Sequence, residues 1–235
     1  MPEHETPEGA TAGPKRRVGR PSKSVLSRRL ILETGLRLID QHGAQGVGMR
    51  AIAKELGVRP SALYNHVAGQ DDLVAGVREL ISDRISVEMF ASQPWDQALA
   101  AWAAHYRGTF AAHPPTIAML AVLPLSENSA TSGMYEVVIA GLVRGGWSGE
   151  QALTLVVALE SFILGSALDM AADDDMLDPG CRDDVPEFTA AFRDRARALA
   201  ERGGNPADAS FELGLRALLT GFRAEYEALG LAPRK

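Results

Sequence analysis

Residues 47–74 decide the fold of this chain, and they read VGMRAIAKELGVRPSALYNHVAGQDDLV. Four apolar residues share one face of a first short helix at helical spacing: Met49, Ile52, Ala53 and Leu56. Gly57 follows at the place of a left-handed C-cap, a conformation that a residue with a Cβ resists. Pro60 suits the first turn of a second helix, where its missing N–H has no helical partner to lose. The segment therefore predicts two short helices that meet at Gly57.

The second helix is expected to have one inner and one outer side. Leu63 and Val67, four residues apart, are expected to face inward. The positions left outside carry mostly hydrogen-bonding groups: Arg59, Ser61, Ala62, Tyr64, Asn65 and His66. This is the pattern of a helix-turn-helix, whose second helix enters the major groove of DNA.

The run MRAIAKELGVRPSALYNHVAGQDDLV resembles the helix-turn-helix of the tetracycline-repressor (TetR) family of bacterial transcription regulators. The resemblance includes the Leu-Tyr-x-His run of Leu63, Tyr64 and His66. A helix-turn within another all-α protein is the alternative, and the coincidence of the turn residues, Pro60 and the Tyr-His pair argues against it. The remainder is similar to the tetracycline-repressor C-terminal domain, from Trp95 through HPPTIAML to ESFILGSALD.

The resemblance implies an all-α fold with a three-helix DNA-binding domain followed by a larger ligand-binding and dimerisation domain. We place the divisions at a disordered basic arm (1–24), a helix-turn-helix domain (25–70) and the ligand-binding domain (71–235). The implied function is a ligand-responsive regulator, most simply a repressor that a small organic effector releases from a double-stranded DNA operator.

Donor geometry and the resemblance together assign the base-reading side chains. Arg50 and Arg59 are expected to reach guanine O6/N7 edges, and Asn65 suits adenine N6/N7. The alternative for both arginines is contact with phosphates alone.

The remaining DNA contacts are implied by position. Ser61, Tyr64 and His66 match family positions that mostly bind phosphates, while Ala62 offers only a methyl group, for example to thymine. Gln70 stands where the family often has a lysine on a phosphate, so we expect a hydrogen bond without the ion release that a charge brings.

The first 24 residues are rich in Pro, Gly, Glu and Thr and are expected to be disordered. They contain Gly19-Arg20-Pro21, which resembles an AT-hook, so Arg16, Arg17 and Arg20 could enter a narrow minor groove. The alternative is a flexible basic tail that adds only non-specific attraction to phosphates.

Charge is distributed unevenly along the chain, although the net charge is −6. Residues 15–66 hold 11 Lys and Arg against 3 acidic residues, whereas residues 67–235 hold 13 against 24. A basic segment that contains the helix-turn-helix, on an acidic body, predicts one DNA-facing end and a remainder that DNA repels.

The composition also bears on the compartment. Cys181 is the only cysteine, so no intramolecular disulfide can form, and the cytoplasm is the expected location. We expect no membrane partner, since no apolar run approaches the roughly 18 residues that span a bilayer and the N-terminus lacks a signal-peptide segment.

The body is expected to be entirely helical. A first helix from about Ser27 to Gly43 precedes the helix-turn-helix, and a fourth helix from Gln70 to about Met89 links it to the body. Later helices are expected at 96–112, 116–123, 133–144, 148–172, 186–201 and 207–229. The helices near 148–172 and 207–229 are expected to pair in a homodimer, as in the family. Alternatively, the apolar stripe of the last helix lies wholly inside one subunit.

An apolar pocket for the effector is expected in the body, where the family has its own. Its candidate residues are Trp102, His105, Tyr106, Met119, Leu120, Met134, Val138, Phe162 and Ser166. Taken alone, each of them is better explained as a core residue, and it is the set that points to a pocket. Leu120 stands near the place where the family member that binds a magnesium–drug chelate has a histidine. We therefore expect an uncharged or aromatic effector in place of magnesium–tetracycline.

The other chemical motifs are weak, and we expect no cofactor, no metal and no catalytic site. Residues 46–51 match G-x-G-x-x-A but follow a helix, whereas a dinucleotide site needs a strand there. Asp173, Asp174, Asp175 and Asp178 lack a calcium-loop spacing, and His105 and His113 lie eight residues apart. The alternative functions are a small-molecule carrier or enzyme with an incidental helix-turn-helix, and a nucleoid-type binder driven by the basic arm.

Overall fold

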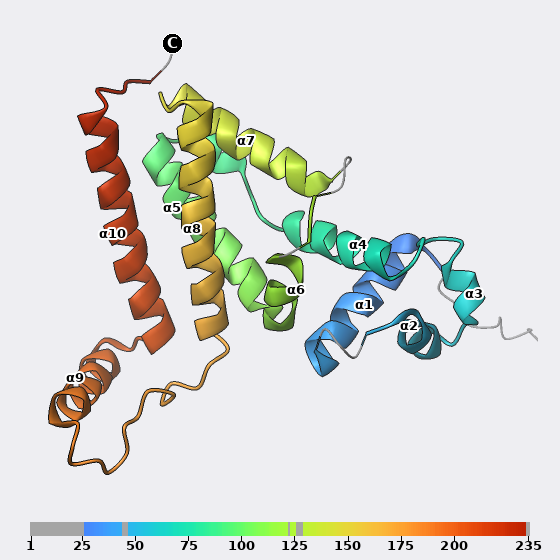
Figure 1. The fold of residues 1–235 in the computed structure, drawn as a ribbon, viewed down its shortest axis with the longest axis horizontal. Coiled ribbons are helices and arrows are strands. Elements are labelled where there is room, and N and C mark those ends of the chain that lie inside the picture. Colours follow the sequence, from blue (N-terminus) through green and yellow to red (C-terminus); the bar gives the residue numbers. More distant parts are fainter. Residues whose placement is uncertain (1–25, 44–46, 122, 126–128, 234–235) are drawn as a thin grey trace, which may run out of the picture.

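The computed structural model describes residues 26–43, 47–121, 123–125 and 129–233. Within these ranges the chain forms ten α-helices and two short 3-10 helices, and no strand, which confirms the all-α fold. The molecule is elongated, with a head of α1–α3 at one end, a body of α5–α10 at the other and α4 between them (Figure 1). The basic arm with Arg16, Arg17 and Arg20 lies outside the described residues.

The head is a three-helix unit around one apolar core. It consists of α1 (Arg28–His42), α2 (Met49–Leu56) and α3 (Pro60–Leu63). Ser27 caps α1 as expected, since its hydroxyl accepts the N–H of Leu30 at 3.2 Å, and Gly43 ends the helix. The side chains of Ile31, Ile39 and Ile52 are almost completely buried between the helices.

Helix α4 (Gln70–Ser82) runs along α1 toward the body. The two helices approach closely at Gly76, where an added Cβ would lie 2.5 Å from Leu32 Cδ2. Only glycine fits this crossing without displacing Leu32. Because α4 packs on both the head and α7, the domain boundary at residue 70 stays a prediction.

The expectation that this helix reaches about Met89 is wrong, since α4 ends at Ser82. A turn follows, in which the N–H of Ile85 donates to the carbonyl of Ser82 at 3.0 Å, and the 3-10 helix η2 (Glu88–Ala91) comes next. Ile85 and Met89 are nevertheless buried. Both residues belong to the core, so their spacing resembles that of a continuing helix. The backbone, however, brings them there through a turn.

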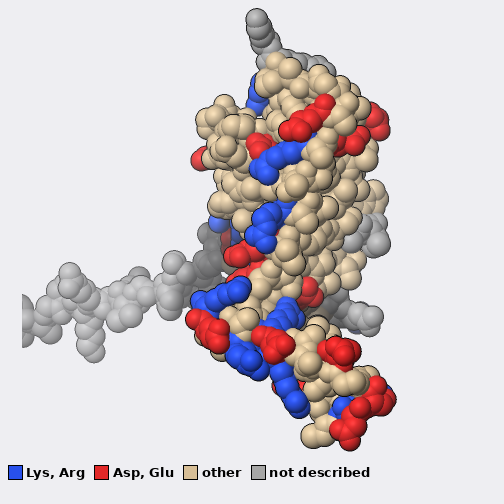
Figure 2. Space-filling model, turned by 90° about the vertical axis from the view of Figure 1, so that its left-hand side faces the viewer, with Lys and Arg blue, Asp and Glu red and all other residues tan. Residues whose placement is uncertain are grey.

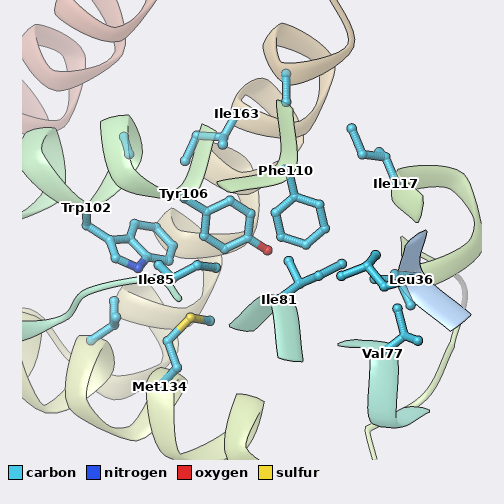
Figure 3. Close-up of a cluster of buried hydrophobic side chains, with 14 of the residues drawn as sticks. Leu36, Val77, Ile81, Ile85, Trp102, Tyr106, Phe110, Ile117, Met134 and Ile163 are labelled. Carbon is cyan, nitrogen blue, oxygen red and sulfur yellow. The ribbon is translucent and has the colours of Figure 1, made fainter. Parts of the chain in front are cut away.

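The body is organised around α5 (Trp95–Ala111). Figure 3 shows Trp102, Tyr106 and Phe110 in a row along this helix, with Ile81 of α4 and Met134 facing them. The other body elements are η3 (Pro114–Thr116), α6 (Ile117–Ala121), α7 (Ala130–Arg144), α8 (Gly149–Asp169), α9 (Pro186–Arg202) and α10 (Pro206–Ala228). Apart from the end of α4, the helices lie within a few residues of their expected ranges.

Helix α8 is longer and more apolar than expected. By length and composition alone it could cross a membrane, so the statement that no apolar run approaches this length is wrong. In the fold, however, one side of α8 packs against α5, α7 and α10. Leu159 and Ile163 are buried on that side, whereas Leu153 and Val157 are each 52% exposed. The run is long because both sides of the helix are apolar.

Candidate functional site

The turn between α2 and α3 has the geometry that the sequence predicted. Gly57 adopts φ 64° and ψ 33°, in the left-handed region, and the N–H of Val58 donates to the carbonyl of Ala53 at 3.0 Å. Pro60 occupies the first turn of α3. These two residues fix the angle at which α3 leaves α2.

Helix α3 and the turn after it separate an inner from an outer side. Leu63 and Val67 are buried, at 0% and 1% exposed, which confirms their inward orientation. Tyr64, between them, is 55% exposed. The other candidate DNA contacts of this segment are exposed (Arg59, Ser61, Asn65) or half-buried (Ala62, His66), and Arg50 is exposed on α2.

Residues 59–67, which we call the recognition segment, are tied by one ion pair to the start of α1 and the start of α4. The guanidinium of Arg28 makes two bonds to the carboxylate of Asp72, at 2.8 and 2.6 Å, and donates to the carbonyl of His66 at 3.0 Å. Asp72 also accepts the N–H of Ala68 at 2.7 Å. The bonds from Arg28 hold the pKa of Asp72 below its ordinary value. The start of α1, the end of the recognition segment and the start of α4 thus move together.

Gln70 has a partner within the protein. Its amide donates to the carbonyl of Val47 at 2.7 Å and so ties the start of α4 to the residues before α2. The same amide nitrogen carries a second hydrogen, which is available for a DNA phosphate. Its role on DNA stays a prediction.

Two neighbouring charged residues of α4 form hydrogen bonds with residues between α6 and α7 and with the first turn of α7. Arg78, 6% exposed, donates to the carbonyls of Leu123 at 2.5 Å and Pro124 at 2.6 Å. Glu79 accepts the hydroxyl of Ser129 at 2.5 Å and the N–H of Thr131 at 3.1 Å. Because charge-assisted bonds of this kind are short and directional, the position of α4 is coupled to that of this segment.

A third connection joins the head to the start of α6. Arg84 donates to Nε2 of His113 at 2.9 Å, and Nδ1 of His113 pairs with Asp40 of α1 at 2.8 Å. His113 therefore has a structural partner on each ring nitrogen. His105, by contrast, is exposed on α5.

A cavity of about 330 Å³ lies where α4, α5, α6, α7 and α8 meet. Seven of its thirteen lining residues are apolar, and the other six are polar or charged. It is lined by Arg78, Ser82, Phe110, Ile117, Leu120, Leu123, Leu125, Thr131, Tyr135, Val157, Glu160, Ser161 and Leu164. A concave, largely apolar space with few polar groups is the form that a small-molecule site takes.

Glu160 and Tyr135 meet in the wall of this cavity, and Tyr106 lies behind Glu160 without lining the cavity itself. Tyr135 donates its hydroxyl to Glu160 at 2.7 Å, and the hydroxyl of Tyr106 also favours the carboxylate form. Burial nevertheless raises the pKa of Glu160 above its ordinary value. Burial, together with the charge of Glu160, also raises the pKa of both tyrosines.

The residues expected to form the pocket are distributed over the whole body. Leu120 lines the cavity, and Tyr106 reaches it through Glu160. Trp102, Met134 and Val138 are buried in the core, as is the hydroxyl of Ser166. Phe162 stacks on Phe211 with ring centroids 5.6 Å apart, whereas Met119 is half-buried and His105 exposed. The ligand-binding role of this set remains a prediction.

Sequence reasoning missed Arg78, Tyr135 and Glu160, which carry the polar chemistry of the cavity wall. A signal existed for one of them. Glu160 is the only charged residue between Gln151 and Leu168, in the middle of an apolar helix. A charge at such a position is retained only where a partner or a ligand compensates for burial.

In the described part of the chain, no group of three or more His, Cys, Asp or Glu side chains is arranged so that it could hold a metal ion. The acidic run with Asp173, Asp174, Asp175 and Asp178 is exposed.

A helix-turn-helix head joined through one helix to a body with a cavity between its helices defines a DNA-binding transcription regulator. The family model described as "Bacterial regulatory proteins, tetR family" matches residues 31–77, and that of the "Tetracyclin repressor-like, C-terminal domain" matches residues 91–226. The chain belongs to the TetR family of bacterial transcription regulators, which is a family of DNA-binding proteins and not of enzymes.

Relatives cover nearly the full length of the chain. An uncharacterised HTH-type regulator of Mycobacterium tuberculosis, Rv0681, is 32% identical over 211 residues, which are 83% of this chain and 91% of the relative. The tetracycline repressor protein class E of Escherichia coli is 24% identical over 200 residues, covering 84% and 90%. Among solved structures, Streptomyces coelicolor ActR in complex with actinorhodin matches with a TM-score of 0.63 at 24% identity, covering 86% of this chain and 99% of ActR.

Proposed function

We propose that this chain is a repressor that binds its operator as a homodimer and leaves it when a small organic effector enters the cavity between α4 and α8. Membership of the family establishes a transcription regulator that binds operator DNA. The sign of regulation, the dimer, the effector and a cytoplasmic location are the proposal. The main support is that Arg78 and Glu79 of α4 form hydrogen bonds with Leu123, Pro124, Ser129 and Thr131, next to the cavity.

The DNA contacts are proposed from exposure and donor type. Arg50 and Arg59 are exposed and suit guanine edges, and Asn65 suits adenine. Ser61, Tyr64, His66 and Gln70 are placed to fix the segment on phosphates, with Ala62 facing a base methyl group. The arm with Arg16, Arg17 and Arg20 would add contacts in the minor groove or with phosphates.

The dimer is proposed from the outer face of α8 and α10. Leu153 and Val157 of α8 and Leu213 of α10 are more than half exposed in the single chain. Figure 2 shows charged side chains gathered most densely over α9 at the lower end, while the surface above is mostly uncharged residues with several charged side chains among them. Exposed apolar side chains on two neighbouring helices are the kind of surface that a second subunit covers.

Helix α10 also serves the interior of its own subunit. Phe211 and Leu219 are buried, and Leu215, Leu218, Phe222 and Tyr226 pack against the same core. Most of the apolar stripe that we had assigned to the dimer is thus used within one chain. The remaining surface, around Leu213 and the exposed residues of α8, is what the proposal assigns to the partner.

The effector step follows from the coupling of α4. A molecule in the cavity would contact Leu123 or Thr131, which the side chains of Arg78 and Glu79 hold. Moving that segment would move α4 and with it the head. In a dimer this changes the separation of two recognition helices, so affinity for an operator of fixed spacing falls. ActR, a structural relative, is solved with a small organic molecule bound.

The test is operator binding by the purified full-length chain at fixed salt. Fluorescence anisotropy with a duplex from the intergenic DNA beside its gene should give an affinity at least about 10³-fold above that for a scrambled duplex. A hydrophobic small molecule that occupies the cavity should lower that affinity. No preference over the scrambled duplex, with a steep salt dependence, would instead identify a nucleoid-type binder, and no binding at all would favour a carrier.

Light scattering tests the dimer separately. Leu213→Glu places a charge on the exposed face of α10, where Leu213 is 61% exposed, and should give a folded monomer with weak operator binding. Met176→Glu is the matched control, since Met176 is 61% exposed in the acidic segment after α8 and should leave the dimer intact.

A further inference from the structure

Glu160 is an isolated charged residue in the middle of the apolar helix α8. It is the only charged residue between Gln151 and Leu168 of α8, and it lines the cavity with most of its carboxylate withdrawn from water. Burying an ionised carboxylate is costly unless an opposite charge or several hydrogen bonds compensate. Its partners therefore decide what else the site requires.

The partners of Glu160 are neutral. Tyr135 donates to one carboxylate oxygen, Oε1, at 2.7 Å, and Tyr106 adds a second phenol. None of the ion pairs in the described part of the chain includes Glu160. The two phenols favour the carboxylate form, yet burial outweighs them and raises the pKa. The negative charge is oriented by hydrogen bonds but not neutralised.

The one basic residue in the cavity wall is directed elsewhere. Both terminal nitrogens of Arg78 donate to main-chain carbonyls, those of Leu123 and Pro124. These bonds belong to the grip on the segment before α7, so Arg78 is not free to turn toward Glu160 without releasing it. Arg78 forms no ion pair with Glu160, so the cavity offers a negatively charged hydrogen-bond acceptor that no basic side chain of the described residues pairs with.

The rest of the wall is suited to an apolar body. Seven of the lining residues are aromatic or aliphatic: Phe110, Ile117, Leu120, Leu123, Leu125, Val157 and Leu164. Leu125, Tyr135 and Val157 also border an open apolar groove of about 430 Å³ between α7 and α8.

We propose that the effector is a hydrophobic organic cation, an amine on an aromatic or aliphatic body, whose ammonium pairs with Glu160. The ammonium supplies the charge that the protein leaves out, and the apolar wall takes the remainder of the molecule. This inference rests on the proposed function for the identity of the cavity as the effector site. It retains the aromatic body expected from the sequence and replaces an uncharged molecule by a cation.

Three probes of one shape test the charge preference directly: naphthylethylamine, naphthylethanol and naphthylacetate. Binding to the purified full-length protein is measured by calorimetry near neutral pH. The wild type should bind the amine at least about tenfold more tightly than the alcohol, and the carboxylate least. Equal affinity for amine and alcohol, or preference for the carboxylate, would overturn the inference.

Two variants locate the preference. Glu160→Gln should abolish the tenfold advantage of the amine and leave the affinity for the alcohol unchanged. Glu136→Gln removes the same charge from the neighbouring open groove, where Glu136 is exposed, and should retain the advantage. If Glu160→Gln keeps the preference, or Glu136→Gln loses it, the assignment to Glu160 is wrong.

The wild type gives the same answer without a substitution, should Glu160→Gln fail to fold. Lowering the pH protonates Glu160 and should remove the preference for the amine while the affinity for the alcohol stays constant. The other titratable groups facing Glu160 are Tyr106 and Tyr135, whose pKa values are raised and which therefore stay neutral, and Arg78 is a guanidinium. An amine preference that does not fall with pH would contradict the inference.

Operator release is measured with the same probes in a separate assay. Amine binding that depends on Glu160 but leaves the operator complex intact upholds the inference and overturns the proposed coupling. Release of the operator by a molecule that needs no Glu160 upholds the proposed function and overturns the inference.

Discussion

The head and the cavity place their functional residues in opposite ways. In the head, the exposed candidates for DNA contact lie between Arg50 and Gln70, on two short helices and the turns that follow them. In the cavity, the wall is assembled from five helices and connecting segments between Arg78 and Leu164. A surface that is read from outside can be built locally, whereas an enclosed space needs walls from distant parts of the chain.

The largest expected effect concerns the inner side of the recognition segment. Leu63→Ala should reduce the free energy of unfolding by about 2–5 kcal/mol, because Leu63 is fully buried and its loss leaves a cavity. Urea denaturation measures this. Tyr64→Ala, at the exposed neighbouring position, should stay within about 0.5 kcal/mol of the wild type while weakening DNA binding. Similar losses of stability for both variants would contradict the division into two sides.

Base reading by the head is the next largest effect. Arg50→Ala should weaken binding to a specific operator by about 1–3 kcal/mol and relax the preference at one base pair. A titration at fixed salt against a set of single-base operator variants measures both. Arg202→Ala, which removes an exposed charge of α9, serves as the control. Unchanged operator affinity, or a loss that is uniform over all sequences, would reduce Arg50 to a phosphate contact or none.

A smaller effect is expected where the head is fastened to α4. Asp72→Asn should lower the free energy of unfolding by up to about 1 kcal/mol, since Arg28 and Asp72 are both partly exposed. The pKa of Asp72 is lowered by Arg28, so the stabilisation is present above the unfolded pKa and disappears as the pH falls through the folded pKa.

Comparing the unfolding of wild type and Asp72→Asn at neutral and strongly acidic pH checks this dependence. Asp71→Asn, an exposed neighbour in the same helical turn, should show a smaller difference. A difference between wild type and Asp72→Asn that persists at low pH would mean that the charge of Asp72 is not responsible.

The smallest effect should have the opposite sign, and it arises in the cavity. Burial raises the pKa of Glu160, so its contribution to stability is fully present below the unfolded pKa and is lost as the pH rises through the folded pKa. Relative to the wild type, Glu160→Gln should therefore gain thermal stability from acidic to neutral pH in the absence of ligand. A difference in Tm that is independent of pH would show that Glu160 titrates as an exposed carboxyl group does.

The sequence predicts the head well because its determinants act over a few residues. Gly57 ends α2 through its own backbone conformation, and the four-residue spacing of Leu63 and Val67 already separates inside from outside. The sequence does not predict the end of α4 correctly, because the spacing of Ile85 and Met89 shows that they are buried but not that they are helical. The core residue Trp102 was selected for the pocket for the same reason: an apolar side chain on α5 is equally suited to either.

The cavity wall depends on contacts across long stretches of sequence, which periodicity does not report. Arg78 bonds to carbonyls more than 40 residues away, and Tyr135 meets Glu160 from another helix, 25 residues away. Only the isolated charge of Glu160 in α8 was visible beforehand, and interpreting it required knowing which side of the helix it occupies.

The crossing at Gly76 has a mechanical consequence. Because the side chain of Leu32 packs directly on the α4 backbone at Gly76, and Arg28 is held by Asp72, sliding α1 past α4 would require both contacts to rearrange. A displacement at the body end of α4 must then be transmitted as a tilt of the whole three-helix unit and not absorbed as a rearrangement within it. Because of this contact at Gly76, α1 and α4 move together as one unit. A small shift near Ser82 then displaces the recognition segment by an amount that grows with its distance from Ser82.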